Sequence, residues 1–224
     1  MINEYICAND VSGHRVGTCY VSSNYPIVYI PITKNAHTWA TSYFSDILHW
    51  QMIHDECMRV YDSSAWHINS TIQNHRKIVI LRNPIGRWMS GIVQYFYTHF
   101  DDNIEITDDI INYLFSKIYF DEHTLPQINF LHNLKLASID FFDMDDNLEV
   151  KLNDYLKNRI TNEYVPIPIT LHKNKTSMKM IQDKKLYEII RKNVTYNRNL
   201  RQKIHDFYKQ DYELLESIKF YGSN

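Results

Sequence analysis

Two short apolar runs, each leading through a polar turn into a stretch with helical spacing, constrain the fold of this chain more than any other feature. The first run spans residues 26–32 (PIVYIPI) and the second spans residues 77–81 (KIVIL). Runs of this length, rich in β-branched residues, predict strands that are buried on both faces. Because a helical stretch follows each run, we expect an α/β fold in which a central parallel sheet is flanked by helices.

Helical spacing is clearest after these two strands. After the first, apolar side chains recur at intervals of three and four residues, at Trp39, Tyr43, Ile47 and Trp50. This face is expected to pack onto the sheet. After the second, residues 85–99 are predicted to be helical, with a proline at the opening of the helix, where proline is favoured.

The rest of the chain continues the α/β pattern. We predict a helix with an acidic start from residue 107, an edge strand over residues 138–142, a helix over residues 147–159 and a helical tail from residue 183. The sequence contains no internal repeat and no low-complexity linker. Residues 1–224 are therefore expected to form a single domain.

Composition restricts the kind of partner. The formal net charge is −2 and 44% of residues are hydrophobic, so we expect a folded core and no nucleic-acid partner. Any site for a charged nucleotide must then be a local positive pocket. The first residues lack a basic and apolar leader, and no apolar run approaches ~18 residues. We expect a cytoplasmic protein without a membrane span.

Neither a disulfide framework nor a metal site is indicated. The three cysteines have no C-x-x-C spacing, and none of the 11 histidines forms an H-E-x-x-H motif. We expect reduced thiols and no catalytic metal.

The polar segment after the first strand is a candidate anion-binding loop. Residues 33–38 (TKNAHT) lie where a strand ends and a helix begins, and free N–H groups and the helix dipole favour an anion at such a junction. The segment adds the ammonium of Lys34 and the hydroxyl of Thr38. It lacks the G-x-x-x-x-G-K-[ST] motif of P-loop NTPases, and by itself it fits a surface lysine beside a helix cap better than an anion site.

A second strand-to-helix junction supplies further anion-binding groups. Arg82 ends the second strand, and Ser90 follows eight residues later on the next helix. Both side chains can therefore face one phosphate beside the first loop. Arg87, on the same helix, is an alternative ligand for that phosphate.

With both junctions in place, the chain resembles sulfotransferases that use 3′-phosphoadenosine 5′-phosphosulfate (PAPS). Residues 34–38 and 80–96 are similar to the two PAPS-binding elements of that family. Further segments follow in the family's order, namely Trp66-His67, His123-x-x-Pro126-Gln127, His172-Lys173-Asn174 and residues 206–221. The similarity spans residues 26–221 and is closest to the carbohydrate branch of chondroitin and uronosyl type. It departs at Pro31, which precedes Lys34 by three residues instead of one, and at His37, where the family commonly has Cys or Gly.

The resemblance implies a P-loop-like sulfotransferase fold, PAPS as donor, no metal, and a hydroxyl acceptor that is a carbohydrate. It implies donor binding by Lys34, Asn35, Ala36, His37, Thr38, Trp39, Arg82, Ser90 and Lys173. Lys34 is expected to neutralise the leaving phosphate, while Arg82 and Ser90 hold the 3′-phosphate. A setting without a leader or anchor suggests a bacterial or viral protein.

A histidine is expected to take the proton from the acceptor hydroxyl. His67 is the first candidate, because related enzymes carry a histidine facing the acceptor at a similar distance before the arginine. His123 is the second, and either it or His67 completes a catalytic set with Lys34. His54 with Glu56 is the third candidate.

Two other functions fit parts of the pattern. A P-loop-like nucleotide kinase would need a magnesium-binding hydroxyl after the loop lysine and an acidic strand end, whereas Arg82 follows the second strand. A catalytically inactive relative that binds a glycan or a nucleotide would not need Lys34, His67 and Arg82 together.

Overall fold

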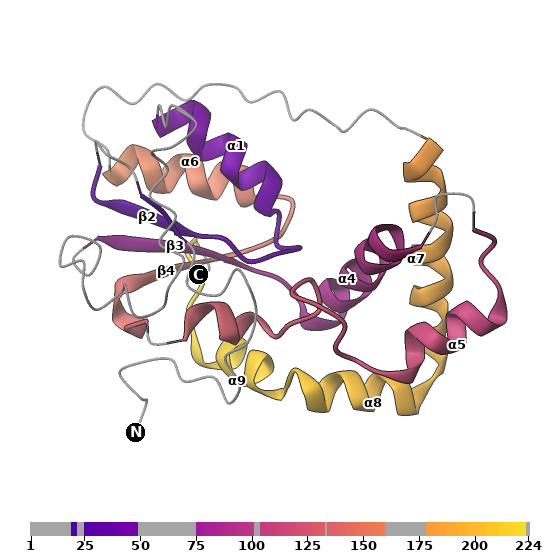
Figure 1. The fold of residues 1–224 in the computed structure, drawn as a ribbon. Coiled ribbons are helices and arrows are strands. Elements are labelled where there is room, and N and C mark those ends of the chain that lie inside the picture. Colours follow the sequence, from indigo (N-terminus) through magenta and orange to yellow (C-terminus); the bar gives the residue numbers. More distant parts are fainter. Residues whose placement is uncertain are drawn as a thin grey trace.

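The central feature of the fold is a mostly parallel sheet. The structure is a computed structural model that describes residues 19–21, 25–48, 75–100, 104–132, 134–159 and 178–222. Within this part of the chain, four strands have the order β1-β2-β3-β4 (Figure 1). Strands β2 (Ile27–Ile30), β3 (Arg76–Leu81) and β4 (Ile139–Asp143) are parallel, and β1 (Tyr20–Val21) pairs antiparallel with β2. The predicted α/β class is confirmed, and β1 is an addition that the sequence pattern did not indicate.

Helices cover both faces of this sheet. Helices α1 (His37–Leu48) and α6 (Leu148–Arg159) lie on one face, and the 3₁₀ helix η1 (Gln127–Leu131) with α9 (Lys209–Ser217) lies on the other (Figure 1). Alternate strand residues enter the two cores: Tyr29 and Ile78 pack toward α1 and α6, while Val28 and Val79 pack toward η1 and α9. This two-sided burial explains why the strands read as continuous apolar runs.

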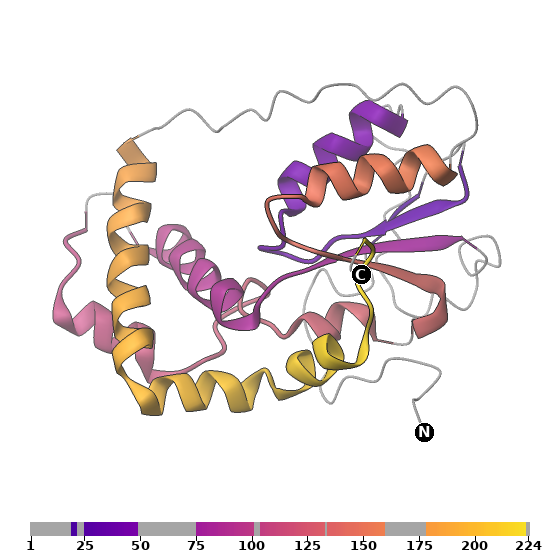
Figure 2. The same cartoon turned by 180° about the vertical axis from the view of Figure 1, so that it is seen from behind.

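A further group of helices packs beside the sheet around its own apolar cluster. It consists of α4 (Pro84–His99), α5 (Asp108–Ser116), α7 (Met178–Tyr196) and α8 (Arg198–Phe207), and Figure 2 shows it from behind. Trp88 is fully buried at its centre, and its Nε1 donates to the carbonyl of Ile118 at 2.9 Å. Contacts of α7 and α8 with α4 fix the direction in which α4 leaves β3.

Local sequence signals explain where the helices begin. The side chain of Asn83 accepts a hydrogen bond from the N–H of Gly86 at 3.2 Å and caps α4, which opens on Pro84. Thr107 caps α5 in the same way, with two acidic residues in the first turn.

Two details differ from the predicted pattern. The C-terminal tail is not continuous, because it breaks at Asn197, which caps α8, and at Tyr208, which separates α8 from α9. On α1, the fully buried face is formed by Ala40, Tyr43 and Phe44, whereas Trp39 is only partly buried. The side chains of Ile47 and Trp50 lie outside the described part of the chain.

Among the helices that the structure describes, none is both long and apolar enough to cross a bilayer.

Candidate functional site

A cavity of about 360 Å³ opens where the three parallel strands end. Its volume lies within the range of small-molecule sites, and the carboxyl edge of a parallel sheet is the usual place for one. The lining residues come from the turns after β2, β3 and β4, from α1 and α4, and from the loop before η1; they are Thr33, Lys34, Ala36, His37, Thr38, Trp39, Arg82, Ser90, Gln94, His123 and Met144. The fold thus brings the two predicted junctions to one cavity.

The turn after β2 has an unusual backbone. Lys34 and Ala36 have φ values of 66° and 56°, in the left-handed region that favours glycine. For residues with a side chain this conformation costs about 1–2 kcal/mol each. Alternating left-handed conformations of this kind let successive N–H groups line a concave anion site, and α1 begins at His37 directly after them. The loop therefore has the form of an anion-binding turn built without glycine.

Lys34 and Arg82 place two cationic groups on this cavity. The ammonium of Lys34 donates to Oε1 of Gln94 on α4 at 3.4 Å, so the side chain crosses toward α4. Nη1 of Arg82 donates to the carbonyl of Lys34 at 3.2 Å. Burial lowers the pKa of Arg82, and a bound anion would act in the opposite direction. Ser90, from the second turn of α4, lines the same cavity.

Asn35 plays a different part from its neighbours in the loop. Its side chain is 1% exposed and donates to the carbonyl of Ile80 at 2.9 Å and to Oε1 of Gln127 at 2.5 Å. Asn35 does not line the cavity, so its side chain fastens the loop to β3. Only its backbone is left for the predicted contact with a donor.

Arg87 is not a phosphate ligand, and this expectation was wrong. It is fully buried and does not line the cavity. Its Nε donates to the carbonyl of Thr33 at 3.0 Å, Nη2 donates to Thr33 Oγ1 at 3.2 Å, and Nη1 donates to the carbonyl of Leu125. Burial lowers the pKa of Arg87. Through these bonds to Thr33, the guanidinium holds the start of the candidate anion-binding loop, residues 33–38, and contributes positive potential to it.

Gln127 and Asp211 support the site from behind, and the sequence did not indicate the role of Gln127. Its Oε1 accepts from the N–H of Arg82 at 3.0 Å, and its Nε2 donates to the carbonyl of Arg82 at 2.9 Å. Asp211, 1% exposed, accepts from the N–H groups of Gln127 and Ile128, both at 2.9 Å. Asp211 therefore docks α9 onto η1. The one available signal was the Pro-Gln pair in the H-x-x-P-Q segment.

His123 reaches the cavity from the loop before η1. Its Nδ1 lies 3.1 Å from Oδ2 of Asp121, and its backbone N–H donates to Oδ1 of the same carboxylate at 2.8 Å. The other candidate residues, His67, Lys173, His54 and Glu56, lie outside the described residues. Within the part of the chain that is described, no three potential metal ligands cluster.

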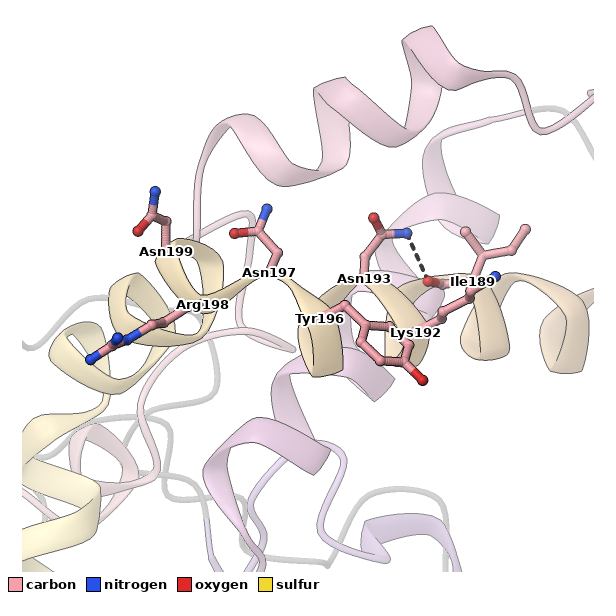
Figure 3. Close-up of a pocket in the computed structure, with 7 residues that line it drawn as sticks. All are labelled: Ile189, Lys192, Asn193, Tyr196, Asn197, Arg198 and Asn199. Atoms are coloured by element: carbon pink, nitrogen blue, oxygen red, sulfur yellow. Dashed lines mark hydrogen bonds between the residues drawn. The ribbon is translucent and has the colours of Figure 1, made fainter.

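A second cavity, of about 750 Å³, lies at the corner between α7 and α8 (Figure 3). Its lining residues are Ile189, Lys192, Asn193, Tyr196, Asn197, Arg198 and Asn199. The hydrogen bond drawn there is internal to α7, from the Asn193 side chain to the carbonyl of Ile189 at 2.9 Å. The cationic side chains at this corner are exposed and point in different directions, so the first cavity is the candidate active site.

Comparison with known proteins agrees with this choice. The model of a family described as the sulfotransferase family matches residues 18–216. This range contains both junctions, the loop that carries His123, and Asp211 of α9. No curated protein and no solved structure matched the chain.

Proposed function

Because the chain belongs to the sulfotransferase family, we propose that it moves a sulfuryl group from PAPS to a hydroxyl of a carbohydrate. Family membership implies a sulfate donor and an acceptor for the sulfuryl group. The identity of the donor, the carbohydrate acceptor and the roles of individual residues are our proposal.

One observation carries the proposal: anion-binding groups from two separate strand ends meet in one cavity. The left-handed turn at residues 34–36 and the Lys34 ammonium suit the phosphosulfate end of the donor. Arg82 and Ser90, on the next junction, suit a second phosphate. A donor with two separated anionic groups, as PAPS has, fits this arrangement better than a single phosphate does.

Sulfuryl transfer requires in-line positioning and charge stabilisation more than covalent catalysis by the protein. The acceptor oxygen bonds to sulfur while the bond between sulfur and the bridging oxygen breaks. Lys34 neutralises the negative charge that develops on that oxygen. A histidine accepts the hydroxyl proton, and His123 lines the cavity where this must occur. His67 remains the alternative base.

A nucleotide kinase is the second candidate, because β4 ends in an acidic residue, Asp143, of the type that binds magnesium. Met144, and not Asp143, lines the cavity. ATP with magnesium is therefore the informative comparison ligand.

The proposal is tested by calorimetric titration with PAP, the desulfated product, and with ATP in the presence and absence of magnesium. We expect magnesium-independent PAP binding at micromolar concentration or below. Arg82→Ala should weaken it by about 10–100-fold, because charge-assisted hydrogen bonds are lost. Arg198→Ala, at the exposed α7–α8 corner, is the control and should bind PAP normally. The proposal would be overturned if the folded protein does not bind PAP, or if it binds ATP and does so only with magnesium.

A further inference from the structure

The pair formed by Asp121 and His123 has a geometry that does more than fold the loop. One carboxylate oxygen accepts from the His123 backbone N–H at 2.8 Å, and the other lies 3.1 Å from Nδ1 of the same histidine. The side chains of His123 and Asp121 are 22% and 24% exposed. The carboxylate thus fixes both the turn and the orientation of the ring.

The turn that carries this pair is held by hydrogen bonds and by close packing. The buried Thr124 hydroxyl accepts from the N–H of Phe120 at 2.9 Å and donates to the carbonyl of Asp121 at 3.0 Å. The hydroxyl of Tyr208 donates to the carbonyl of Thr124. Helix α4 approaches the backbone of the turn so closely at Gly91 that no side chain fits between them. His123 therefore has little freedom to leave the cavity wall.

A carboxylate beside Nδ1 determines which nitrogen of the ring carries the proton. A carboxylate can only accept a hydrogen bond, so Nδ1 must hold the hydrogen. In a neutral imidazole the lone pair then lies on Nε2, the other nitrogen of a ring that lines the cavity.

We propose that Asp121 is a positioning residue, which holds His123 in the Nδ1–H tautomer so that Nε2 accepts the proton of the acceptor hydroxyl. This inference rests on the proposed function and selects His123 as the base. The proton moves from the hydroxyl to Nε2, and the imidazolium that forms is stabilised by the carboxylate on its opposite side.

The charges around the pair are consistent with an ionised carboxylate. Burial acts to raise the pKa of Asp121, but the hydrogen bond and charge of His123 outweigh burial, and the pKa is lowered. His99 lowers it further from α4, and Tyr95 and the buried Arg87 also act on this carboxylate. Across the cavity, Lys34 and Arg82 are cationic. The carboxylate is thus available as an acceptor at neutral pH.

Asp121→Asn is the decisive variant, because an amide keeps one oxygen for the backbone N–H but presents an NH₂ donor to Nδ1. The hydrogen of the imidazole should then move to Nε2, and kcat should fall by about 10²–10⁴-fold. The affinity for PAP and the KM for PAPS should stay within about twofold, because the donor-binding groups are untouched. The ¹⁵N NMR signals of His123 should report the change of tautomer.

Asp145→Asn is the matched control. Asp145 also accepts from a backbone N–H two residues later, at 3.0 Å, and pairs with Lys151 at 2.7 Å, but it does not line the cavity. Its turnover should equal that of the wild type. The double variant Asp121→Asn with His123→Ala should be no slower than His123→Ala alone.

The possible outcomes separate this inference from the proposed function. If the wild-type protein fails to bind PAP or to transfer sulfate, the proposed function fails. If the wild type transfers sulfate and His123→Ala keeps its turnover, His123 is not the base and this inference fails alone. The inference also fails if Asp121→Asn loses turnover without any change of the His123 tautomer, because the carboxylate is then only structural.

Discussion

The close approach of α4 to the turn that carries His123 gives the sharpest stability prediction. A Cβ added at Gly91 would lie 2.4 Å from the carbonyl oxygen of His123 and 2.9 Å from Cγ2 of Thr124, whereas ordinary contacts begin at 3.4 Å. Gly91→Ala must therefore move the two backbones apart by about 1 Å. Overpacking of this kind costs about 1–3 kcal/mol. A loss of about 2 kcal/mol should lower the Tm by about 4–8 °C.

The same displacement should affect catalysis, because the turn carries His123 and leads into Gln127. A misplacement of about 1 Å at a reacting group can reduce turnover about 10²-fold. Gly86→Ala is the control on the same helix, because its Cβ would meet only the Arg82 side chain, at 3.5 Å or more. Removing this helical glycine should leave stability unchanged or raise it by up to about 1 kcal/mol. Calorimetric unfolding and turnover of both variants test the reasoning, and a Gly91→Ala protein that matches the wild type in both would refute it.

Two further predictions concern groups outside the cavity. Gln127→Met should lower the free energy of unfolding by about 2–4 kcal/mol in urea titrations and should weaken PAP binding, because buried groups of Arg82 and Asn35 lose their hydrogen bonds to Gln127. The control is Gln202→Met, at an exposed position on α8, which should change the free energy of unfolding by less than about 0.5 kcal/mol. Equal losses of stability in the two variants would contradict the role of Gln127. For Asp140, burial raises the pKa, but the hydrogen bonds from Arg76 and Tyr155 outweigh it and the pKa lies below its usual 3.8. Asp140→Asn should therefore cost about 2 kcal/mol near neutral pH. The difference from the wild type should shrink as the pH falls below about 4, because Asp140 of the unfolded chain then binds a proton before Asp140 of the folded protein does; a difference that does not depend on pH would exclude this explanation.

The strands of the sheet could be predicted from the sequence because strands that are buried on both faces consist of continuous apolar residues. Apolar β-branched residues fill β2 and β3, and a polar turn with a helix start follows each of them. Strand β1 spans only Tyr20–Val21, which is too short for any periodicity. The break at Tyr208 also lacks a local signal, since neither Gly nor Pro occurs there. The hydrogen bond from its hydroxyl to the carbonyl of Thr124 is a tertiary contact.

Only some residues of the candidate site could be predicted from the sequence. Lys34 and Arg82 could be predicted from their places at strand ends, because the carboxyl edge of a parallel sheet gathers such residues, and Ser90 from its place on the helix that follows Arg82. Arg87 lies only five residues after Arg82, yet it turns into the core instead of toward the cavity. The sequence around them does not show which of these two arginines faces the cavity. What distinguishes them is the set of carbonyl groups from Thr33 and Leu125, which only the folded chain brings together.

The strained turn after β2 shows why the anion site depends on the whole fold. The left-handed backbone conformation of Lys34 and of Ala36 costs about 1–2 kcal/mol of free energy at each residue, a strain that glycines at these positions would avoid. The loop is held in place by Arg87, and through Asn35 by Gln127, which lies 92 residues away. Asp211 in turn holds Gln127 from the C-terminal helix. Each link stabilises the conformation that we propose for binding the anion through its backbone, so loss of a link should weaken PAP binding even where the altered side chain never touches the ligand.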